Sequence, residues 1–290
     1  MFKKKKDQIY QSYWSISWNI FKKNKVAMVC LFIVILLCLI ALFAPLIAPY
    51  DPNKQVLTDR LMKPCGQHWF GTDDLGRDIF SRIIYGCRVS LSVGIISQII
   101  ATVIGYTMGV CAGYFGGKVD MIMQRIVEIL NSIPYLITVT LLLLVMKPGL
   151  MSITFALMFS GWLGMSRIAR AEVLKLKEQE YVLASRTLGA KSFRIIFKEI
   201  LPNIFGPLIT QTMFSIPHAI FTEAFLAFIG LGVPEPMASL GSLISSGYQN
   251  FTSHPYMIVF PLIVMGLLML CFNMLADGLR DALDPKMKDM

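Results

Sequence analysis

Long apolar runs alternate with short charged segments along this 290-residue chain. A helix needs about 20 mostly apolar residues to cross a hydrocarbon core of about 30 Å. Six segments are long enough, so the pattern predicts six membrane-spanning helices. They are expected within residues 26–44, 89–117, 129–146, 148–166, 205–230 and 256–276.

The composition supports this interpretation. Hydrophobic residues make up 55% of the chain, the mean hydropathy is +0.62, and only 16% of the residues are charged. A soluble globular domain is typically about 45–50% apolar and about 25% charged. The chain is therefore expected to be an all-α membrane protein. Its first apolar run is longer than the roughly 7–15 residues of a signal peptide, so we expect it to be retained as a span.

The lysines and arginines predict the orientation of the helices, because cytoplasmic loops carry an excess of them. Seven lysines precede the first span and eight basic residues lie in the loop 167–203, whereas the segment between the fifth and sixth spans has none. Both termini are therefore expected in the cytoplasm. The outer segment 49–88 departs from this bias with six basic residues, which five aspartates roughly balance.

The expected organisation has five parts. A cytoplasmic segment 1–25 precedes the first transmembrane helix at 26–48, and an extracytoplasmic segment 49–88 follows. A five-helix core at 89–277 includes the loop 167–203, and a cytoplasmic tail occupies 278–290. Aromatic residues recur at helical spacing in the first segment, which favours a helix in the membrane interface over a disordered basic tail. These residues are Tyr10, Trp14, Trp18 and Phe21. The net charge of +9 is thus assigned to lipid phosphates and protein partners rather than to nucleic acid.

The loop 167–203 is long for a compact bundle, and such loops are usually functional. Its first half predicts a short helix that ends at Gly189, where glycine can adopt the left-handed conformation of a helix C-terminus. Small residues on this helix, Ala184 and Ser185, form a low ridge that another protein's groove can approach closely. A second amphipathic helix is predicted next, and Pro202 is expected to break it before the fifth span.

At these positions the sequence resembles a known family, the importer permeases of the ATP-binding-cassette class. The matching residues of the loop are Ala184, Ser185, Gly189, Leu201 and Pro202. In that family the short helix docks into a groove on an ATPase subunit. The chain departs from the pattern where Leu183 replaces an acid, Ser185 replaces an alanine and Glu199 replaces an isoleucine. The first departure leaves no acid for a salt bridge at that position, whereas the docking ridge remains.

Other segments resemble the peptide-importer permeases of this class, in the same order along the chain. They are residues 68–94, 113–120, 228–241 and 277–285. Leu240 stands where the family has a tryptophan. The resemblance covers nearly the whole chain and is greatest to the second of the two permeases in dipeptide and oligopeptide importers, a group that includes nickel importers.

The resemblance implies a permease with six transmembrane helices in the inner or plasma membrane of a prokaryote. It implies a second homologous permease, two ATP-binding ATPase subunits and an extracytoplasmic solute-binding protein as partners, besides membrane lipid. The chain has no G-x-x-x-x-G-K-[ST] pattern, so it is not expected to be an enzyme or to hold a cofactor. Its three histidines are too scattered to predict a metal site.

Glu223 is the one acid well inside a predicted span, where ionisable residues are costly and often functional. Either it lines or gates a path, or it lies near the outer interface, capped by water or by neighbouring hydroxyl groups. In the third span, Asn131, Ser132 and Pro134 are expected to introduce a kink.

A G-x-x-x-G ladder in the second span predicts close packing of that helix, within the bundle or against a paired permease. Its members are Gly105, Gly109 and Gly113. The six cysteines are interpreted as small hydrophobes. Cys65 and Cys87 share a polar segment, which leaves a disulfide between them open.

Three functions are compatible with these features. An ATP-driven importer of peptides, of nickel or of another small solute requires the loop and the partners described above. A secondary transporter driven by an ion gradient commonly has internal repeats and midplane ion sites, but the two halves show no repeat and only Glu223 is a candidate ion ligand. A structural scaffold would not need such a loop. A peptide importer is favoured, although the chain itself does not identify the solute, because the binding protein performs most of the selection.

Overall fold

The computed structural model describes residues 13–147 and 149–283, so Tyr10 and the tail beyond residue 283 lie outside the described residues. The described chain consists of helices, turns and loops, with one isolated bridge between Thr72 and Asp78. The α-helices are α1 Tyr13–Lys23, α2 Lys25–Leu42, α3 Ala44–Ile47, α4 Ile79–Phe115, α5 Gly117–Asn131, α6 Tyr135–Val145, α7 Leu150–Leu176, α8 Glu180–Thr187, α9 Ser192–Ile195, α10 Leu201–Phe228, α11 Leu240–Gln249 and α12 Tyr256–Leu283. A 3-10 turn, η1, covers Leu57–Asp59, and a π-helical turn, η2, covers Ile196–Ile200.

Among the described residues, α2, α4 and α12 are long and apolar enough to cross a membrane. The pair α5 and α6 makes a fourth candidate if it is counted as one span. α7 and α10 occupy the fourth and fifth predicted segments with 27 and 28 residues, but charged or polar residues interrupt both, and neither is among the candidates. The molecule is thus an all-helical membrane protein with three or four clear candidate spans.

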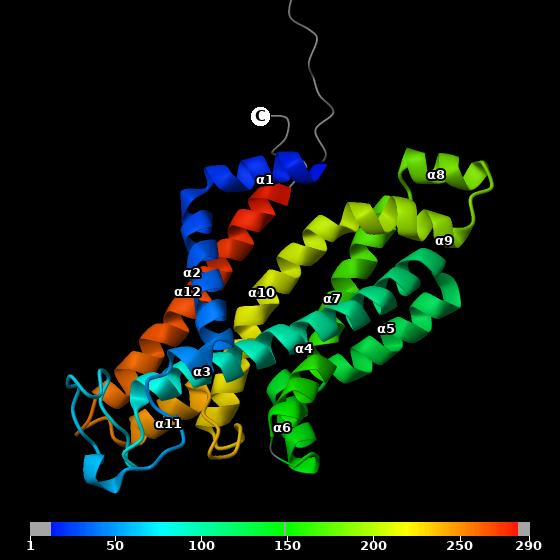
Figure 1. The fold of residues 1–290 in the computed structure, drawn as a ribbon. Helices are drawn as coiled ribbons and strands as arrows, with labels where there is room; N and C mark the ends of the chain where they lie inside the picture. Colours follow the sequence, from blue (N-terminus) through cyan, green and yellow to red (C-terminus); the bar gives the residue numbers. More distant parts are fainter. Residues whose placement is uncertain (1–12, 148, 284–290) are drawn as a thin grey trace, which may run out of the picture.

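α4 begins at Ile79, well before the predicted second span. Asp78 caps its first turn, because the carboxylate accepts a hydrogen bond of 2.8 Å from the backbone N–H of Ser81. Residues 79–88, assigned from the sequence to the extracytoplasmic segment, therefore belong to this helix. Its 37 residues extend about 55 Å, and Figure 1 shows the helix running obliquely across the molecule.

The predicted third span is broken rather than kinked. α5 ends at Asn131, α6 begins at Tyr135, and the two axes differ by 82°. Pro134 cannot continue a helix from α5, because it lacks a backbone N–H and its ring clashes with the preceding turn. α6 alone has 11 residues, a length of about 17 Å, which is short for a hydrocarbon core of about 30 Å.

The helices place different loops at two ends of the molecule. α1, the C-terminal end of α12, α8 and α9 lie at one end, which we call the α8 end (Figure 1). α3, α6 and α11 lie at the other end, together with the loops between α3 and α4. Between them α4 packs mainly along α7, and α12 lies against α2, α10 and α11.

α1 lies across the end of α12, as Figure 1 shows. Phe21 is buried in a small apolar cluster formed with α12. Trp14 and Trp18 are about half-exposed, and Lys22 Nζ lies 5.3 Å from the centre of the Trp18 ring. Half-exposed tryptophans beside lysines are typical of a helix at a membrane interface.

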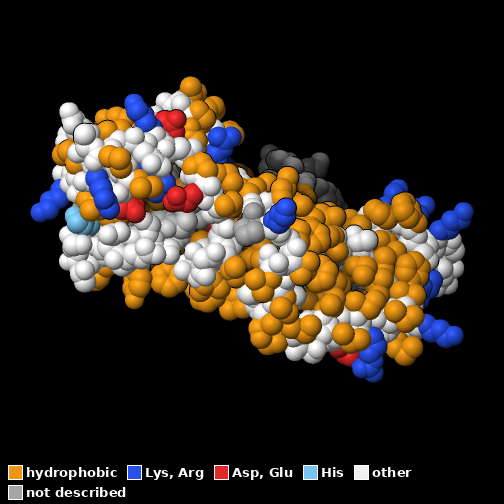
Figure 2. Space-filling model, turned by 90° about the horizontal axis from the view of Figure 1, so that it is seen from below, with side chains coloured by type: hydrophobic (Ala, Val, Ile, Leu, Met, Phe, Trp, Pro, Cys, Tyr) orange, Lys and Arg blue, Asp and Glu red, His pale blue; other side chains and the backbone are white. Residues whose placement is uncertain are grey.

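Large apolar side chains remain exposed on the flanks of the helices, and Figure 2 shows them over much of one face. On α2 they include Val29, Phe32, Leu36 and Leu39. A soluble monomer rarely exposes so large a contiguous apolar surface. These flanks are therefore suited to contact with lipid or with another membrane subunit.

Candidate functional site

The helices α8 and α9 form a hook that projects at the α8 end (Figure 1). α8 ends in a Schellman motif: the N–H of Gly189 donates to the Arg186 carbonyl at 3.0 Å, and the N–H of Ala190 donates to the Ser185 carbonyl at 3.1 Å. Gly189 has a φ of +82°, which is costly for residues with a Cβ atom. This geometry agrees with the predicted end of the short helix.

One face of α8 is attached to the rest of the chain. Val182 is fully buried in an apolar cluster that also contains Ile195 and Ile200. Beside it, the Ser185 hydroxyl donates a hydrogen bond of 2.5 Å to Oε1 of Glu199. Both contacts tie α8 to the segment that leads into α10.

Two further contacts, made by Tyr181 and Arg186, attach α8 to the rest of the chain. The side-chain amide of Asn203 donates to the Glu199 carbonyl at 2.6 Å and reaches the Tyr181 hydroxyl at 3.4 Å. Burial and the nearby Glu199 carboxylate raise the pKa of Tyr181, so its hydroxyl is neutral at physiological pH. The Arg186 guanidinium lies 5.9 Å from the centre of the Tyr114 ring at the end of α4.

The opposite face of α8 is exposed. Leu188 is 88% exposed and Leu183 is 46% exposed, with the small side chain of Ala184 on the same surface. On the neighbouring segment, the rings of Phe193 and Phe197 are also largely exposed and lie 4.3 Å apart. An exposed apolar patch within a charged loop indicates a protein contact. We call this surface, formed by Leu183, Ala184, Leu188, Phe193 and Phe197, the hook surface.

Pro202 does not break the helix as the sequence predicted. The chain passes from α9 through η2 into α10 without leaving helical geometry, and the N–H of Leu201 bonds to the Ile196 carbonyl five residues earlier. Pro202 lies in the first turn of α10, where a missing N–H is tolerated, and the wider π turn removes the clash that its ring would make in a regular α-helix. Leu201 is half-buried against the same apolar cluster as Val182.

Glu223 lies in α10 with no exposed surface. Its Oε2 accepts a hydrogen bond of 2.8 Å from the Ser90 hydroxyl of α4, and the Ser239 hydroxyl beside α11 also interacts with this carboxyl group. Ser90 also accepts a hydrogen bond of 3.2 Å from the N–H of Leu240, the first residue of α11. In this conformation Glu223 links α10 to α4 and α11 rather than lining an open path.

The three glycines of the G-x-x-x-G ladder face α7. A Cβ atom on Gly105 would lie 2.5 Å from Met165 Cβ, and one on Gly109 would lie 2.2 Å from the Ser166 carbonyl oxygen. A Cβ atom on Gly113 would lie 2.9 Å from Val173 Cβ. Because real Cβ contacts are not this short, only glycine allows α4 and α7 to approach so closely. The structure thus places the ladder inside the bundle.

At the opposite end, a buried ion network joins the segment before α4 to the loop before α11. Asp73 accepts from Nε of Arg77 at 2.6 Å and from Arg82 at 3.1 Å, and Arg77 also donates to Glu235 at 3.2 Å. Asp73, Arg77 and Arg82 are at most 4% exposed. Asp73 and Arg77 are four residues apart and Arg82 follows Asp73 by nine, and no ion pair was predicted from this spacing.

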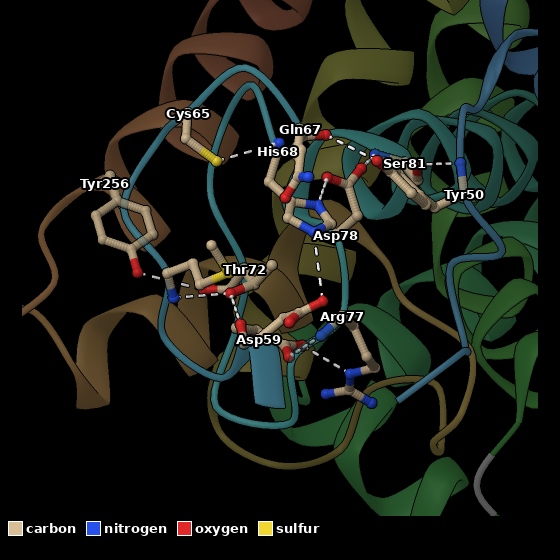
Figure 3. Close-up of polar contacts among 12 residues, drawn as sticks. Tyr50, Asp59, Cys65, Gln67, His68, Thr72, Arg77, Asp78, Ser81 and Tyr256 are labelled. Carbon is tan, nitrogen blue, oxygen red and sulfur yellow. Dashed lines mark hydrogen bonds and ion pairs between the residues drawn. The ribbon is translucent and has the colours of Figure 1, made fainter. Parts of the chain in front are cut away.

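Figure 3 shows further polar contacts that fold the same segment. His68 Nδ1 lies 2.9 Å from a carboxylate oxygen of Asp78. The Thr72 hydroxyl donates to the Asp59 carbonyl, and the Tyr256 hydroxyl of α12 donates to the Thr72 carbonyl at 3.3 Å. The outer segment is therefore a structured unit fixed to α4 and α12.

The six cysteines are free in the structure. Cys65 is exposed and Cys87 is buried within α4. The disulfide that the sequence left open is therefore not formed.

A polar cavity of 640 Å³ opens between α7, α10 and α12, toward the α8 end. Its lining includes Glu172 and Lys175 from α7, Gln211 from α10 and Arg280 from α12. The cavity is therefore lined by both acidic and basic side chains, within a bundle that is largely apolar.

Comparison with known proteins identifies the family. Residues 102–289 match the model of the binding-protein-dependent transport system inner membrane component. The chain belongs to this family of permeases. Residues 12–64 also match the N-terminal TM domain of oligopeptide transport permease C.

The permease is 48% identical to the dipeptide transport system permease protein DppC of Bacillus subtilis, over 96% of this chain and 87% of that protein. It is 46% identical to the oligopeptide transport system permease protein OppC of the same organism, over 96% and 91%. It is therefore an inner membrane permease of the DppC and OppC type.

A solved structure supports the fold of the permease. The inward-facing MetNI methionine ABC transporter aligns with a TM-score of 0.60 and 20% identity, over 71% of this chain and 98% of that one. At this identity the likeness shows the fold alone, which is that of an ABC importer permease. As a non-catalytic transmembrane subunit of such a transporter, the chain depends on ATPase partners.

Proposed function

We propose that this permease is one of two homologous membrane subunits in an ATP-driven importer of dipeptides or oligopeptides, and that it forms half of the solute path. The relatives at 48% and 46% identity are dipeptide and oligopeptide permeases, and a glutathione transport permease is 36% identical over 98% of the chain. These are all peptide solutes, which supports peptide import over nickel import. The polar cavity between α7, α10 and α12 suits a zwitterionic solute, because its lining carries both acid and base.

In this proposal the chain crosses the membrane six times, with both termini and the α8 hook in the cytoplasm. α7 and α10 are the fourth and fifth spans, which packing inside the bundle and against the second permease shields from lipid. The broken pair α5 and α6 is the third. The excess of lysine and arginine in the first 25 residues and in the loop 167–203 supports this orientation.

The observation that carries the proposal is the hook surface on α8. Its inner face is anchored by Val182 and Ser185, whereas its outer face presents Leu183, Ala184 and Leu188 to a partner. Two ATPase subunits would bind the hooks of the two permeases and move them when ATP binding brings the ATPases together. An extracytoplasmic binding protein would deliver the solute to the opposite end, where the ion network holds the outer segment.

The test is co-purification in mild detergent from the native membrane. The wild-type chain is expected to bring down a second permease and a P-loop ATPase. Leu188→Glu and Ala184→Arg should lose the ATPase and keep the second permease, because they place charge in the hook surface. Burial of one leucine stabilises by about 1.5–3 kcal/mol, so affinity should fall by roughly 10- to 150-fold.

The control is Leu57→Glu, which places the same charge on a 71% exposed leucine at the opposite end and should retain both partners. The proposal is wrong if the wild-type chain binds no ATPase in several mild detergents. It is also wrong if both hook variants retain the ATPase at wild-type levels.

A further inference from the structure

In the part of the chain that the structure describes, one side-chain hydrogen bond joins α8 to η2, and it is formed by Ser185 and Glu199. The Ser185 hydroxyl donates to Oε1 of Glu199 at 2.5 Å, within the range of a hydroxyl bonded to a charged carboxylate. The other oxygen, Oε2, is shielded from solvent and has no partner. Ser185 is therefore the main side-chain donor available to this carboxylate.

Ser185 and Glu199 are both partly buried where they meet. A carboxylate that loses solvent without a hydrogen bond is costly, so Glu199 needs a donor at this position. The two side chains satisfy each other across 14 positions in the sequence. The serine therefore supplies the hydrogen bond that this carboxylate requires.

The hydrogen bond between Ser185 and Glu199 lies where α8 meets the turn η2 that leads into α10. The apolar attachment of α8 depends on a single fully buried side chain, Val182, and the rest of its inner face is polar. Glu199 lies in the π turn η2, which runs without a break into α10. A displacement of α8 can pass into α10 through this junction, where the Tyr181–Asn203 contact and the apolar cluster around Val182 also join the two helices.

We propose that Ser185 and Glu199 form a polar latch that fixes α8 to the start of α10, so that movement of the hook is transmitted to α10. They are positioning residues and contact neither solute nor nucleotide. This inference depends on the proposed function, because the movement originates in the ATPase subunits.

The first test is hydrogen–deuterium exchange of residues 180–189 in the full chain in nanodiscs, without ATPase. Ser185→Ala leaves a shielded carboxylate without its donor, so exchange should accelerate about tenfold or more, equivalent to about 1.4 kcal/mol. Glu199→Ile should have a smaller effect, because the half-buried Ser185 hydroxyl can turn to water. The double variant Ser185→Ala/Glu199→Ile replaces the polar contact with an apolar one and should exchange within about threefold of wild type.

The second test is the number of ATP molecules hydrolysed per solute imported, measured with the complete importer in liposomes. This ratio should rise in Ser185→Ala and return toward the wild-type value in the double variant. A defect confined to folding or assembly would lower import and hydrolysis together and would not change the ratio. Ser192→Ala is the control, since it removes an exposed hydroxyl from the same loop and should change neither measurement.

Each contrary result has a separate meaning. If Ser185→Ala exchanges like Ser192→Ala, the latch is refuted and the proposed function is untouched. If exchange accelerates while the ratio stays constant, the contact is structural and does not transmit movement. If the wild-type chain binds no ATPase, the proposed function fails and this inference fails with it.

Discussion

The hydroxyl of Ser90 in α4 donates a hydrogen bond of 2.8 Å to the carboxylate of Glu223 in α10. The same hydroxyl accepts the N–H of Leu240 at the start of α11, so one serine joins three helices. Gly241 lies against the Ala224 backbone at this junction, where a Cβ atom would come within 2.3 Å of Cα. In this conformation Glu223, the acid that the sequence marked as a candidate for the path or gate, is bonded to α4 and through Ser90 to the start of α11.

We expect Ser90→Ala to destabilise the permease by about 1–3 kcal/mol, because it removes a hydrogen-bond donor from a buried carboxylate. Glu223→Gln should have a smaller effect, since the amide can still accept the serine hydroxyl. The measurement is the apparent melting temperature of the purified chain. Ser97→Ala is the matched control: Ser97 is equally buried in α4, but its hydroxyl bonds only the Gly94 carbonyl of its own helix. Equal melting temperatures for the two alanine variants would contradict this account.

The sequence predicted the elements that depend on apolar periodicity. The apolar runs located α2, α12 and the membrane portion of α4, and the short helix before Gly189 was placed correctly because glycine at its end is a local signal. Two helices begin at local capping signals that the apolar pattern does not show. Asp78 is a helix cap, and it extends α4 to Ile79. Ser239 and Ser242 form a capping box that starts α11, in a region expected to be loop.

Other features were not predictable because they depend on tertiary contacts. The sequence marks Glu223 as an intramembrane acid, but only the fold brings Ser90 to it from 133 positions away. Pro202 is a helix breaker by local rules, but in the fold it follows a π turn whose Ile196 and Ile200 are buried in the apolar cluster. In the sequence, Ser185 and Glu199 are two separate differences from the pattern that the loop resembles. Only the structure shows that their side chains are in contact.

Gly109→Ala should separate α4 from α7, because the new Cβ atom would lie 2.2 Å from the Ser166 carbonyl oxygen and 2.8 Å from Ala169 Cβ. Overpacking of this kind typically costs about 1–3 kcal/mol. We expect a lower melting temperature and a smaller yield of monodisperse protein. Gly164→Ala is the control, since its Cβ atom would meet nothing within 4 Å. That variant should be neutral or slightly more stable, because alanine favours helix. A neutral Gly109→Ala would show that the helices are not in close contact there.

Asp73→Asn should loosen the outer segment. It removes the charge that faces the guanidinium groups of Arg77 and Arg82, both nearly fully buried. Breaking a buried ion pair from one side typically costs about 3–5 kcal/mol. We expect faster proteolysis of the segment between α3 and α4, together with a lower melting temperature. Asp51→Asn is the control, because Asp51 is exposed and accepts only the N–H of Asn53. Equal proteolysis of the two variants would exclude a structural role for the Asp73 network.

The break between α5 and α6 leaves α5 to be held against α7 by specific contacts, and the main polar one joins Asp120 to Arg170. Two parallel hydrogen bonds of 2.6 Å connect the carboxylate and the guanidinium, and both side chains are 20–30% exposed. Partly exposed pairs contribute about 0.2–1 kcal/mol, and the bidentate geometry places this one toward the upper end. Asp120→Asn should therefore destabilise only slightly, whereas Asp120→Lys should do so more strongly by placing two cations together.

The double variant Asp120→Lys/Arg170→Asp tests whether the pair itself matters, because it restores opposite charges in reversed order. We expect it to recover part of the melting temperature lost in Asp120→Lys. The control is Glu128→Lys, which disrupts the Arg125–Glu128 pair in α5; those side chains are 74% and 55% exposed, so little change is expected. If charge reversal gives no recovery, α5 is held by its apolar face. The ion pair would then be a consequence of the helix position rather than one of its causes.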